Sequence, residues 1–418
     1  MPKPLSPARV QRDIFAAMPR PPRPPALPHS APIGHHRVTG LFAGIGGIEL
    51  GLHRAGHETA LLCEIDPGAR AVLAAHFGSA RIVGDVTTMA DLPADTSLLA
   101  AGFPCQDLSQ AGKTAGIAGR NSGLVSHVFR LLRRRRVPWV LLENVSFMLR
   151  LARGQALAYV LDELDALGYT WAYRVVDSRS FGLPQRRQRV YLLACLPDFG
   201  DPRDVLLSDD AGDPADEPYQ GKANGFYWTE GIRGLGWAVN AVPTLKGGST
   251  IGIASPPAIW LPNGDIVTPD IRDGERLQGF PADWTRPALD VARRGHRWKL
   301  VGNAVSVDAA EWIGSRLLDP GVYDPSDDLP LERGTSWPSS AWSAARGERF
   351  RSFASLWPMH FPGEPLSEFL AYPASPLSAR ACAGFLKRAR SSSLRFPAGL
   401  LEAVEAHLES LQLHSTAA

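Results

Sequence analysis

Residues 38–47 read VTGLFAGIGG, and this stretch decides the fold. Its first half, Val38 to Phe42, is a short apolar run typical of a buried strand, and a helical pattern follows from Ile48 to Ala55. The glycines between them let the backbone approach a ligand at the amino end of that helix. Gly-x-Gly-Gly alone is also compatible with a simple tight turn. The stretch therefore predicts a strand, a turn and a helix of an α/β protein, with a candidate ligand site at the turn.

The alternation of strands and helices continues along the first half of the chain. We expect further strands at 59–63, 81–83, 98–101, 139–142, 169–177 and 190–195, and helices at 69–76, 125–135 and 156–167. Strands that alternate with helices predict a mostly parallel sheet covered by helices on both faces.

Changes of composition divide the remaining sequence. Residues 1–36 are rich in proline and arginine and are expected to be an extended or disordered tail. The α/β pattern covers 37–195, breaks over 196–267 and returns over 268–318. The irregular stretch is long enough to favour a small separate domain over a single loop. Residues 319–418 form an extension that is partly helical, near 379–389 and 398–411.

The overall composition limits the classes of partner. The chain has 418 residues, of which 44% are hydrophobic and 21% charged, as in globular proteins. A net charge of +2 means that a nucleic-acid partner needs a local basic face rather than a global excess. No apolar run is long enough to span a membrane, and the start of the chain lacks a secretory signal. We therefore expect no membrane partner and a cytoplasmic location, which agrees with the small number of cysteines.

One cysteine occupies a suggestive position. Cys105 lies in GFPCQ (102–106), directly after the expected strand 98–101. None of the four cysteines is spaced from another as metal ligands or a redox pair would be, so we expect no metal. A thiol on a rigid turn at a strand end is a common position for a nucleophile, and a buried, inert cysteine is the alternative.

Two carboxylates add to the glycine turn. Glu64 ends the second expected strand, where a carboxylate can hold ribose hydroxyls, and Asp85 ends the third, where it can accept a hydrogen bond from an exocyclic amine. Either alone is more often a helix cap or a solvated charge. Together with the turn they predict a ligand that contains a nucleoside.

Several short motifs occur in one order between residues 38 and 318. They are FAGIGG (42–47), GFPCQ (102–106), ENV (143–145), QRRQR (185–189), RLQGFP (276–281) and GNAV (302–305). In this order they resemble the motifs of the DNA cytosine-5 methyltransferases, of the bacterial type II restriction-modification type. The resemblance implies a Rossmann-like class I S-adenosyl-methionine-dependent methyltransferase sheet and a small irregular target-recognition domain at 196–267, whereas the C-terminal helical extension falls outside the common family pattern. Ala304 departs from the usual serine, and Ile65 from the usual aromatic residue.

The resemblance also implies roles for individual residues. Cys105 would form a covalent bond to C6 of a cytosine flipped out of double-stranded DNA, and Glu143 would bind N3 and the exocyclic amine. Arg189 would donate to the base O2, and Arg187 would orient Glu143 or the cysteine segment. The implied contacts to the cofactor S-adenosyl-methionine are Phe42, Gly44, Ile45, Gly47, Glu64, Ile65, Asp85, Val86, Pro104, Asn303 and Val305. The implied DNA contacts are Arg233, Thr244, Leu245, Lys246 and Ser249.

Other functions remain open at this point. A related branch of the family methylates transfer RNA, but its Cys-Phe-Thr signature is absent here. A regulator that binds DNA without activity would not need Cys105, Glu143, Arg187 and Arg189 together. For the leading function we expect a monomer, a role in restriction-modification or phage defence, and a cognate restriction endonuclease as a candidate partner. The extension at 319–418 is expected to pack on the core, with DNA contact or binding of that nuclease as alternatives.

Overall fold

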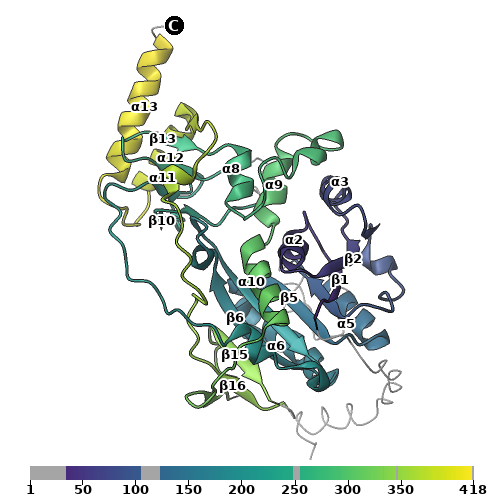
Figure 1. The fold of residues 1–418 in the computed structure, drawn as a ribbon. Helices are drawn as coiled ribbons and strands as arrows, with labels where there is room; N and C mark the ends of the chain where they lie inside the picture. Colours follow the sequence, from purple (N-terminus) through teal and green to yellow (C-terminus); the bar gives the residue numbers. More distant parts are fainter. Residues whose placement is uncertain (1–33, 105–122, 248–254, 333, 345–346, 417–418) are drawn as a thin grey trace, which may run out of the picture.

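The computed structural model describes residues 34–104, 123–247, 255–332, 334–344 and 347–416. A ten-stranded sheet runs through its centre in the order β14-β16-β15-β6-β8-β5-β4-β1-β2-β3 (Figure 1). Its strands are β1 (Arg37–Leu41), β2 (Glu58–Cys63), β3 (Arg81–Val83), β4 (Leu98–Ala101), β5 (Trp139–Val145), β6 (Thr170–Asp177), β8 (Gln188–Cys195), β14 (Leu329–Pro330), β15 (Ser340–Ser343) and β16 (Arg349–Arg351).

Only one half of this sheet is parallel. The neighbours from β3 to β5 pair in parallel, whereas β5–β8, β8–β6 and every pair beyond them are antiparallel. The prediction of a mostly parallel sheet was therefore wrong for the second half. The cause is the connection at residues 178–187, which is too short for a parallel crossover and returns the chain directly along β6.

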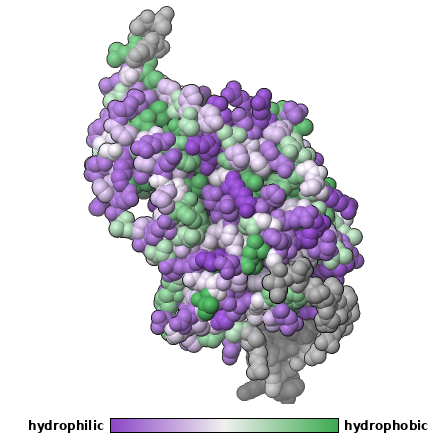
Figure 2. All heavy atoms as spheres, viewed as in Figure 1, coloured by the Kyte–Doolittle hydropathy of each residue, from purple (hydrophilic) through white to green (hydrophobic). Residues whose placement is uncertain are grey.

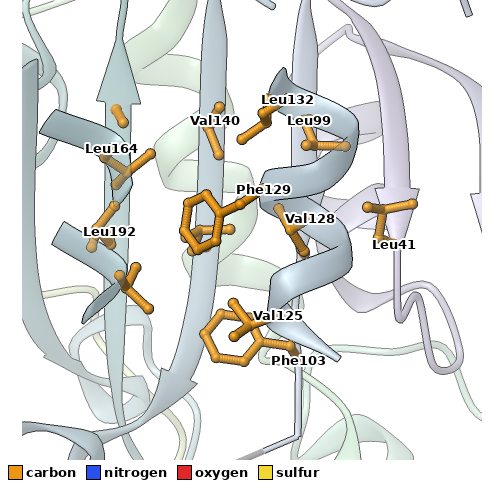
Figure 3. Close-up of a cluster of buried hydrophobic side chains, with 14 of the residues drawn as sticks. Leu41, Leu99, Phe103, Val125, Val128, Phe129, Leu132, Val140, Leu164 and Leu192 are labelled. Atoms are coloured by element: carbon orange, nitrogen blue, oxygen red, sulfur yellow. The ribbon is translucent and has the colours of Figure 1, made fainter. Parts of the chain in front are cut away.

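Successive residues of each strand point to opposite sides of the sheet. Both sets of side chains are apolar, and helices cover both faces. Leu99 faces α5 (Val125–Arg134) and α6 (Gln155–Ala166), whereas Leu98 faces α2 (Gly47–Arg54) and α10 (Val307–Leu318). Figure 3 shows the first of these interfaces, where the apolar side of α5 packs onto β1, β4 and β5. Its labelled residues are Leu41, Leu99, Phe103, Val125, Val128, Phe129, Leu132, Val140, Leu164 and Leu192.

The close packing of α2 and α10 brings the late part of the chain back to the glycine turn. A Cβ on Gly51 of α2 would overlap the Val307 carbonyl oxygen of α10, so only glycine allows this approach. Beside them α3 (Pro67–His76), α9 (His296–Asn303) and the 3₁₀ helix η6 (Arg286–Asp290) form a separate apolar cluster. Residues after 268 thus line the same edge of the sheet as the residues after β1.

The irregular stretch has a sheet of its own, in the order β10-β9-β12-β13-β17. These strands are β9 (Asn224–Phe226), β10 (Ala238–Val239), β12 (Ala258–Trp260), β13 (Ile266–Thr268) and β17 (Ser375–Pro376). The extension contributes to both sheets: β14, β15 and β16 lengthen the large one, and β17, α12 (Ala379–Arg390) and α13 (Leu400–Thr416) complete the small one. Figure 1 shows α13 projecting from this end of the molecule.

The shorter elements connect these parts. They are α7 (Pro202–Leu206), α8 (Ile271–Arg276), α11 (Leu366–Phe369), β7 (Gln185–Arg186), β11 (Val242–Pro243) and the 3₁₀ helices η1 (Val86–Thr88), η2 (Ser146–Leu149), η3 (Leu151–Gly154), η4 (Ser178–Phe181) and η5 (Pro197–Phe199). Polar side chains dominate the face seen in Figure 2, with apolar ones scattered among them. Within the described ranges, no helix has the length and apolar character to cross a membrane.

Candidate active site

The predicted site residues follow neighbouring parallel strands. Glu64 comes directly after β2, Gly102 after β4, and Glu143 lies near the end of β5. The carboxyl ends of parallel strands meet at one edge of a sheet, which is where open α/β sheets bind their ligands. The motifs that lie far apart in the sequence therefore converge at this edge.

Glu64 holds the glycine turn in shape. Its Oε2 accepts a hydrogen bond from the Gly44 amide at 2.8 Å, and its Oε1 accepts one from the Asp66 amide at 2.8 Å. Phe42 and Gly44 have left-handed φ angles of 55° and 56°. A Cβ on Gly44 would meet no atom within 4 Å, so this part of the turn faces open space.

The other side of the turn is closely packed. A Cβ on Gly47 would lie 2.6 Å from the Val305 carbonyl oxygen, which brings the 302–305 motif against the start of α2. Ile45 and Val86 are buried, with 1% and 4% of their surface exposed. Both residues were expected to contact the cofactor, and their side chains pack in the apolar core instead of pointing to open space.

An apolar side chain and a second carboxylate lie beside this turn. Ile65 is 69% exposed, unusual for a large aliphatic residue, and it follows Glu64 directly. Asp85 is half-buried after β3 and accepts a hydrogen bond from the Thr87 amide at 2.8 Å, which lowers the pKa of its carboxyl group. An open glycine, an exposed aliphatic side chain and two carboxylates suit a ligand with an apolar ring and several hydroxyl or amine donors.

Glu143 forms a buried ion pair. Its Oε1 lies 3.2 Å from Arg189 Nε, and both side chains are about nine-tenths buried. Its Oε2 would lie 3.4 Å from a Cβ on Gly102, so the carboxylate borders the segment that leads to Cys105. Burial raises the pKa of Glu143, while the positive charges of Arg189 and Arg187 oppose that rise. The sequence suggested Arg187 as the residue that orients Glu143, whereas the ion pair is formed by Arg189.

Asn144 fixes the backbone in front of the cysteine. Its Nδ2 donates to the Phe103 carbonyl oxygen at 3.0 Å, and its Oδ1 accepts from the Val145 amide at 2.9 Å. Phe103 packs beside Val125 of α5 (Figure 3), whereas Pro104 is exposed. Cys105 itself and Ser249 lie outside the described residues, so the structure places only the segment that leads to the thiol.

Arg187 differs from its expected role. It is fully buried and donates to the backbone oxygens of Leu245 at 3.2 Å, Gly302 at 3.4 Å and Ala304. Burial lowers the pKa of its guanidinium to about 9. Its charge acts on Glu143, but its hydrogen bonds join the small domain to the 302–305 motif.

A buried polar cluster without a predicted role joins the motifs. Gln185 Nε2 donates to the Leu277 carbonyl oxygen at 2.7 Å and to Gln278 Oε1 at 3.1 Å, and its Oε1 accepts from the Leu245 amide at 2.9 Å. Gln278 Nε2 in turn donates to the Val301 carbonyl oxygen at 2.8 Å. The only signal in the sequence was the position of both glutamines inside the 185–189 and 276–281 motifs.

The predicted DNA contacts separate into buried and exposed residues. Leu245 is 2% exposed and packs in the core of the small domain, so its side chain is not available to a base and that prediction was wrong. Thr244 Oγ1 donates to the Arg186 carbonyl oxygen at 2.8 Å. Lys246 is exposed, pairs with Glu230 and lies 3.9 Å from the ring centre of Tyr227.

Two remaining predicted residues are at the surface. Arg233 is exposed and lines a pocket of about 590 Å³ together with Ile232 and Arg388. Asn303 is exposed next to the small domain, because a Cβ on Gly247 would overlap its side-chain amide. Its side chain therefore faces Gly247, whereas Val305 packs towards Gly47 through its carbonyl oxygen.

Sequence reasoning also missed a buried acid below the glycine turn. Glu49 of α2 is 1% exposed and lies against Gly40 of β1, where any larger residue would overlap its carboxyl group. Its Oε2 has no hydrogen-bond partner among the described residues. Burial raises the pKa of this carboxyl group to about 8.

Comparison with known proteins identifies relatives over most of the chain. Residues 36–210 match the family model for C-5 cytosine-specific DNA methylases. The type II methyltransferase M2.BsuMI of Bacillus subtilis is 50% identical over 371 residues, which cover 84% of this chain and 93% of that protein. The type II methyltransferase M.NlaX of Neisseria lactamica is 32% identical over 310 residues, covering 67% of this chain and 96% of that protein.

A solved structure has the same fold. The S. pombe Dnmt2 methyltransferase superposes with a TM-score of 0.50 at 17% identity, covering 68% of this chain and 99% of that one. The likeness extends to the α/β sheet with its helical layers and supports the predicted fold class.

Proposed function

Because this chain belongs to the C-5 cytosine-specific DNA methylases, we propose that it transfers a methyl group from S-adenosyl-methionine to C5 of a cytosine in a specific sequence of double-stranded DNA. The observation that carries the proposal is the buried Glu143–Arg189 pair beside Gly102, at the sheet edge that also holds the turn fixed by Glu64. We place the target base and the nucleoside cofactor at this edge, next to the segment that leads to Cys105.

C5 of cytosine must be activated before it can accept a methyl group, because it is a weak nucleophile. The Cys105 thiolate adds to C6, and the electron pair of the C5–C6 double bond becomes available at C5. Glu143, protonated, donates to N3, where negative charge develops, and accepts from the exocyclic amine. Arg189 donates to O2. The bound cofactor supplies the methyl group on a sulfonium. Loss of the C5 proton and release of the Cys105 sulfur then restore the aromatic ring.

The raised pKa of Glu143 supports this role. A carboxyl group whose pKa is raised by burial keeps its proton to higher pH, and only the protonated form can donate a hydrogen bond to a ring nitrogen. The positive charge of Arg189 opposes this rise in the pKa of Glu143. The target base must rotate out of the duplex to reach this buried position.

The cofactor would bind across the turn and the next two strand ends. Glu64 would hold the ribose hydroxyls, Ile65 would cover one face of the adenine, and Asp85 would accept from its amine. The open side of Gly44 leaves room for the ligand at the turn. The remaining proposed contacts are Phe42, Gly47, Pro104, Asn303 and Val305, with backbone contacts from Ile45 and Val86.

We assign recognition of the DNA sequence to the small domain at 196–267. Arg233, Thr244 and Lys246 are its described candidate contacts, together with Ser249 outside the described residues. By analogy with the relatives, whose names are those of type II methyltransferases, we propose a role in restriction-modification, as a monomer that acts beside a cognate restriction endonuclease.

A trapping experiment tests the covalent step. Duplex oligonucleotides that carry 5-fluorocytosine cannot lose a proton at C5, so the enzyme should stay bound to them in the presence of cofactor. Cys105→Ser should bind cofactor normally but give neither the trapped complex nor methylated DNA. Methylation at a near-normal rate by that variant would rule out the covalent assignment.

A second experiment separates the substrate classes. Incubation with tritiated cofactor and either duplex DNA or transfer RNA should label the DNA alone. Label in RNA alone would make the protein an RNA methyltransferase, and no label in either would make it a regulator. Bisulfite sequencing of host DNA, with and without the protein, should then give the recognition sequence.

A further inference from the structure

We propose that three residues next to the catalytic strand, Phe147, Arg150 and Arg153, bind the phosphodiester backbone of the duplex beside the target cytosine. We call them the basic stripe. The proposal rests on the proposed function, since it needs duplex DNA as the substrate. None of the three was among the DNA contacts expected from the sequence.

The position of the basic stripe places it at the active-site edge. Strand β5 ends at Val145, two residues after Glu143, and the 3₁₀ helices η2 and η3 follow at once. Phe147 lies in η2 and Arg153 in η3, and Arg150 is the residue that joins the two. The Arg150 amide donates to the Phe147 carbonyl oxygen at 3.0 Å and the Arg153 amide to the Arg150 carbonyl oxygen at 3.1 Å, so two successive tight turns hold the three residues close together in this segment.

The two sides of this segment differ in character. Met148 is buried, and Leu149 and Leu151 pack against the core below the sheet. Phe147 is 59% exposed, and both arginines are exposed as well. The segment is therefore anchored by its apolar residues and presents one aromatic ring and two guanidinium groups outward.

The two arginines have no acceptor within the described part of the protein. Neither forms an ion pair or a side-chain hydrogen bond there. Two other exposed arginines of the same domain do have partners: Arg133 pairs with Glu163, and Arg134 donates to the Ala90 carbonyl oxygen. Unpaired guanidinium groups beside a site for DNA are available to phosphate oxygens, which they bind through two parallel hydrogen bonds.

The backbone that carries Arg153 is held in an uncommon conformation. Ala152 and Arg153 have left-handed φ angles of 50° and 58°, which residues with a Cβ adopt at an energetic cost. The following Gly154 is braced from the extension, because Trp337 Nε1 donates to its carbonyl oxygen at 2.9 Å and the Trp337 ring lies where a Cβ would be. The extension thus supports the turn that presents Arg153.

The test compares the double variant Arg150→Ala/Arg153→Ala with the wild type in binding of a duplex oligonucleotide at several salt concentrations. Each phosphate contact contributes roughly 0.9 to the slope of log affinity against log salt, so the slope should fall by about 1.8. The KM for DNA should rise, while kcat at saturating DNA and the affinity for S-adenosyl-methionine should stay as in the wild type.

Two further variants complete the design. Arg81→Ala removes an exposed arginine at the start of β3, on the opposite edge of the sheet, and should leave the slope unchanged. Arg150→Lys/Arg153→Lys keeps both charges and should restore most of the slope. If the wild type methylates DNA and the double alanine variant keeps its slope and KM, the basic stripe does not bind DNA. If the wild type methylates no DNA, the proposed function itself fails.

Discussion

The Glu143 carboxylate lies 3.2 Å from Arg189 Nε, across two antiparallel strands whose register pairs Val145 with Arg189. Both side chains are buried at the carboxyl end of β5. In such a pair each charge depends on the other, because a single buried charge is far more costly than a matched pair. The pair therefore controls whether Glu143 is protonated. If protonated Glu143 acts in catalysis, its pKa should be visible in the pH dependence of methylation.

We predict that Arg189→Met shifts the pH dependence of methylation. Burial raises the pKa of Glu143 and the Arg189 charge lowers it, so loss of Arg189 should raise the pKa further. If protonated Glu143 is the active form, the fall of kcat/KM at high pH should move to higher pH, on a lower overall rate. Arg179→Met, which breaks an ion pair with Asp177 away from Glu143, is the control. If the pH profile of Arg189→Met is unchanged, the fall of kcat/KM at high pH is not caused by ionisation of Glu143.

Two glycines of the same turn should respond differently to alanine. Gly44→Ala costs roughly 1–2 kcal/mol for its left-handed φ and places a methyl group in the open space assigned to the cofactor, so cofactor affinity should fall. Gly47→Ala should destabilise the fold by about 1–3 kcal/mol through its clash with Val305. Calorimetry and thermal unfolding of both variants measure this. If Gly44→Ala binds the cofactor with wild-type affinity, the cofactor does not bind at this turn.

Removing the Glu64 carboxylate should weaken cofactor binding. Glu64→Ala loses the proposed ribose contact and the two amide hydrogen bonds that shape the turn, which should cost about 1–3 kcal/mol of binding free energy. Glu58→Ala is the matched control, since Glu58 begins the same strand at its far end and is exposed. If the two variants bind the cofactor with equal affinity, Glu64 does not contact the cofactor.

The order of strands and helices was predictable because buried strands and amphipathic helices leave clear periodic patterns. Helix α12, expected at 379–389, spans Ala379–Arg390. Strand direction leaves no such pattern, and so the antiparallel insertion of β8 between β5 and β6 was missed. The edge strand β14 was missed as well, because Leu329–Pro330 is too short for any alternation to show.

The residues of the candidate site were easier to predict than the hydrogen bonds that join them. Glu143 and Arg189 lie in separate motifs that were both expected at the site, and the two side chains do meet, although Arg187 was the residue expected to orient Glu143. The contacts of Gln185 with Leu277 and Gln278 join segments far apart in the sequence, and no local pattern records which buried amide finds which carbonyl group. Leu245, which was expected to contact DNA, is buried for the same reason, since its burial depends on neighbours from other segments.

Asn144→Asp should slow methyl transfer without loss of cofactor affinity. The carboxylate keeps the shape of the side chain but cannot donate to the Phe103 carbonyl oxygen, so the segment before Cys105 loses its tether. We expect a loss of roughly 1–3 kcal/mol in stability and a lower single-turnover rate. Asn263→Asp, in an exposed turn, is the control for the added charge. A normal single-turnover rate would show that the thiol does not depend on this tether.

Glu49→Gln should remove a pH-dependent loss of stability. The folded-state pKa of Glu49 is about 8, above the ordinary value of 4.5, so between these values the folded protein holds a proton that the unfolded chain releases. The wild-type free energy of unfolding should therefore fall as pH rises through this window, by at most about 1.4 kcal/mol per pH unit, and the contribution should be constant above it.

Denaturant unfolding of Glu49→Gln and wild type at roughly pH 5.5, 7 and 8.5, two values inside that window and one just above it, measures this difference. The variant should gain stability relative to wild type at each step, because its amide has no proton to lose. Glu368→Gln, on the exposed side of α11, is the control and should show no such trend. Parallel curves for Glu49→Gln and wild type would mean that the Glu49 carboxyl group ionises as readily in the folded protein as in the unfolded chain, and that it finds a partner below the glycine turn.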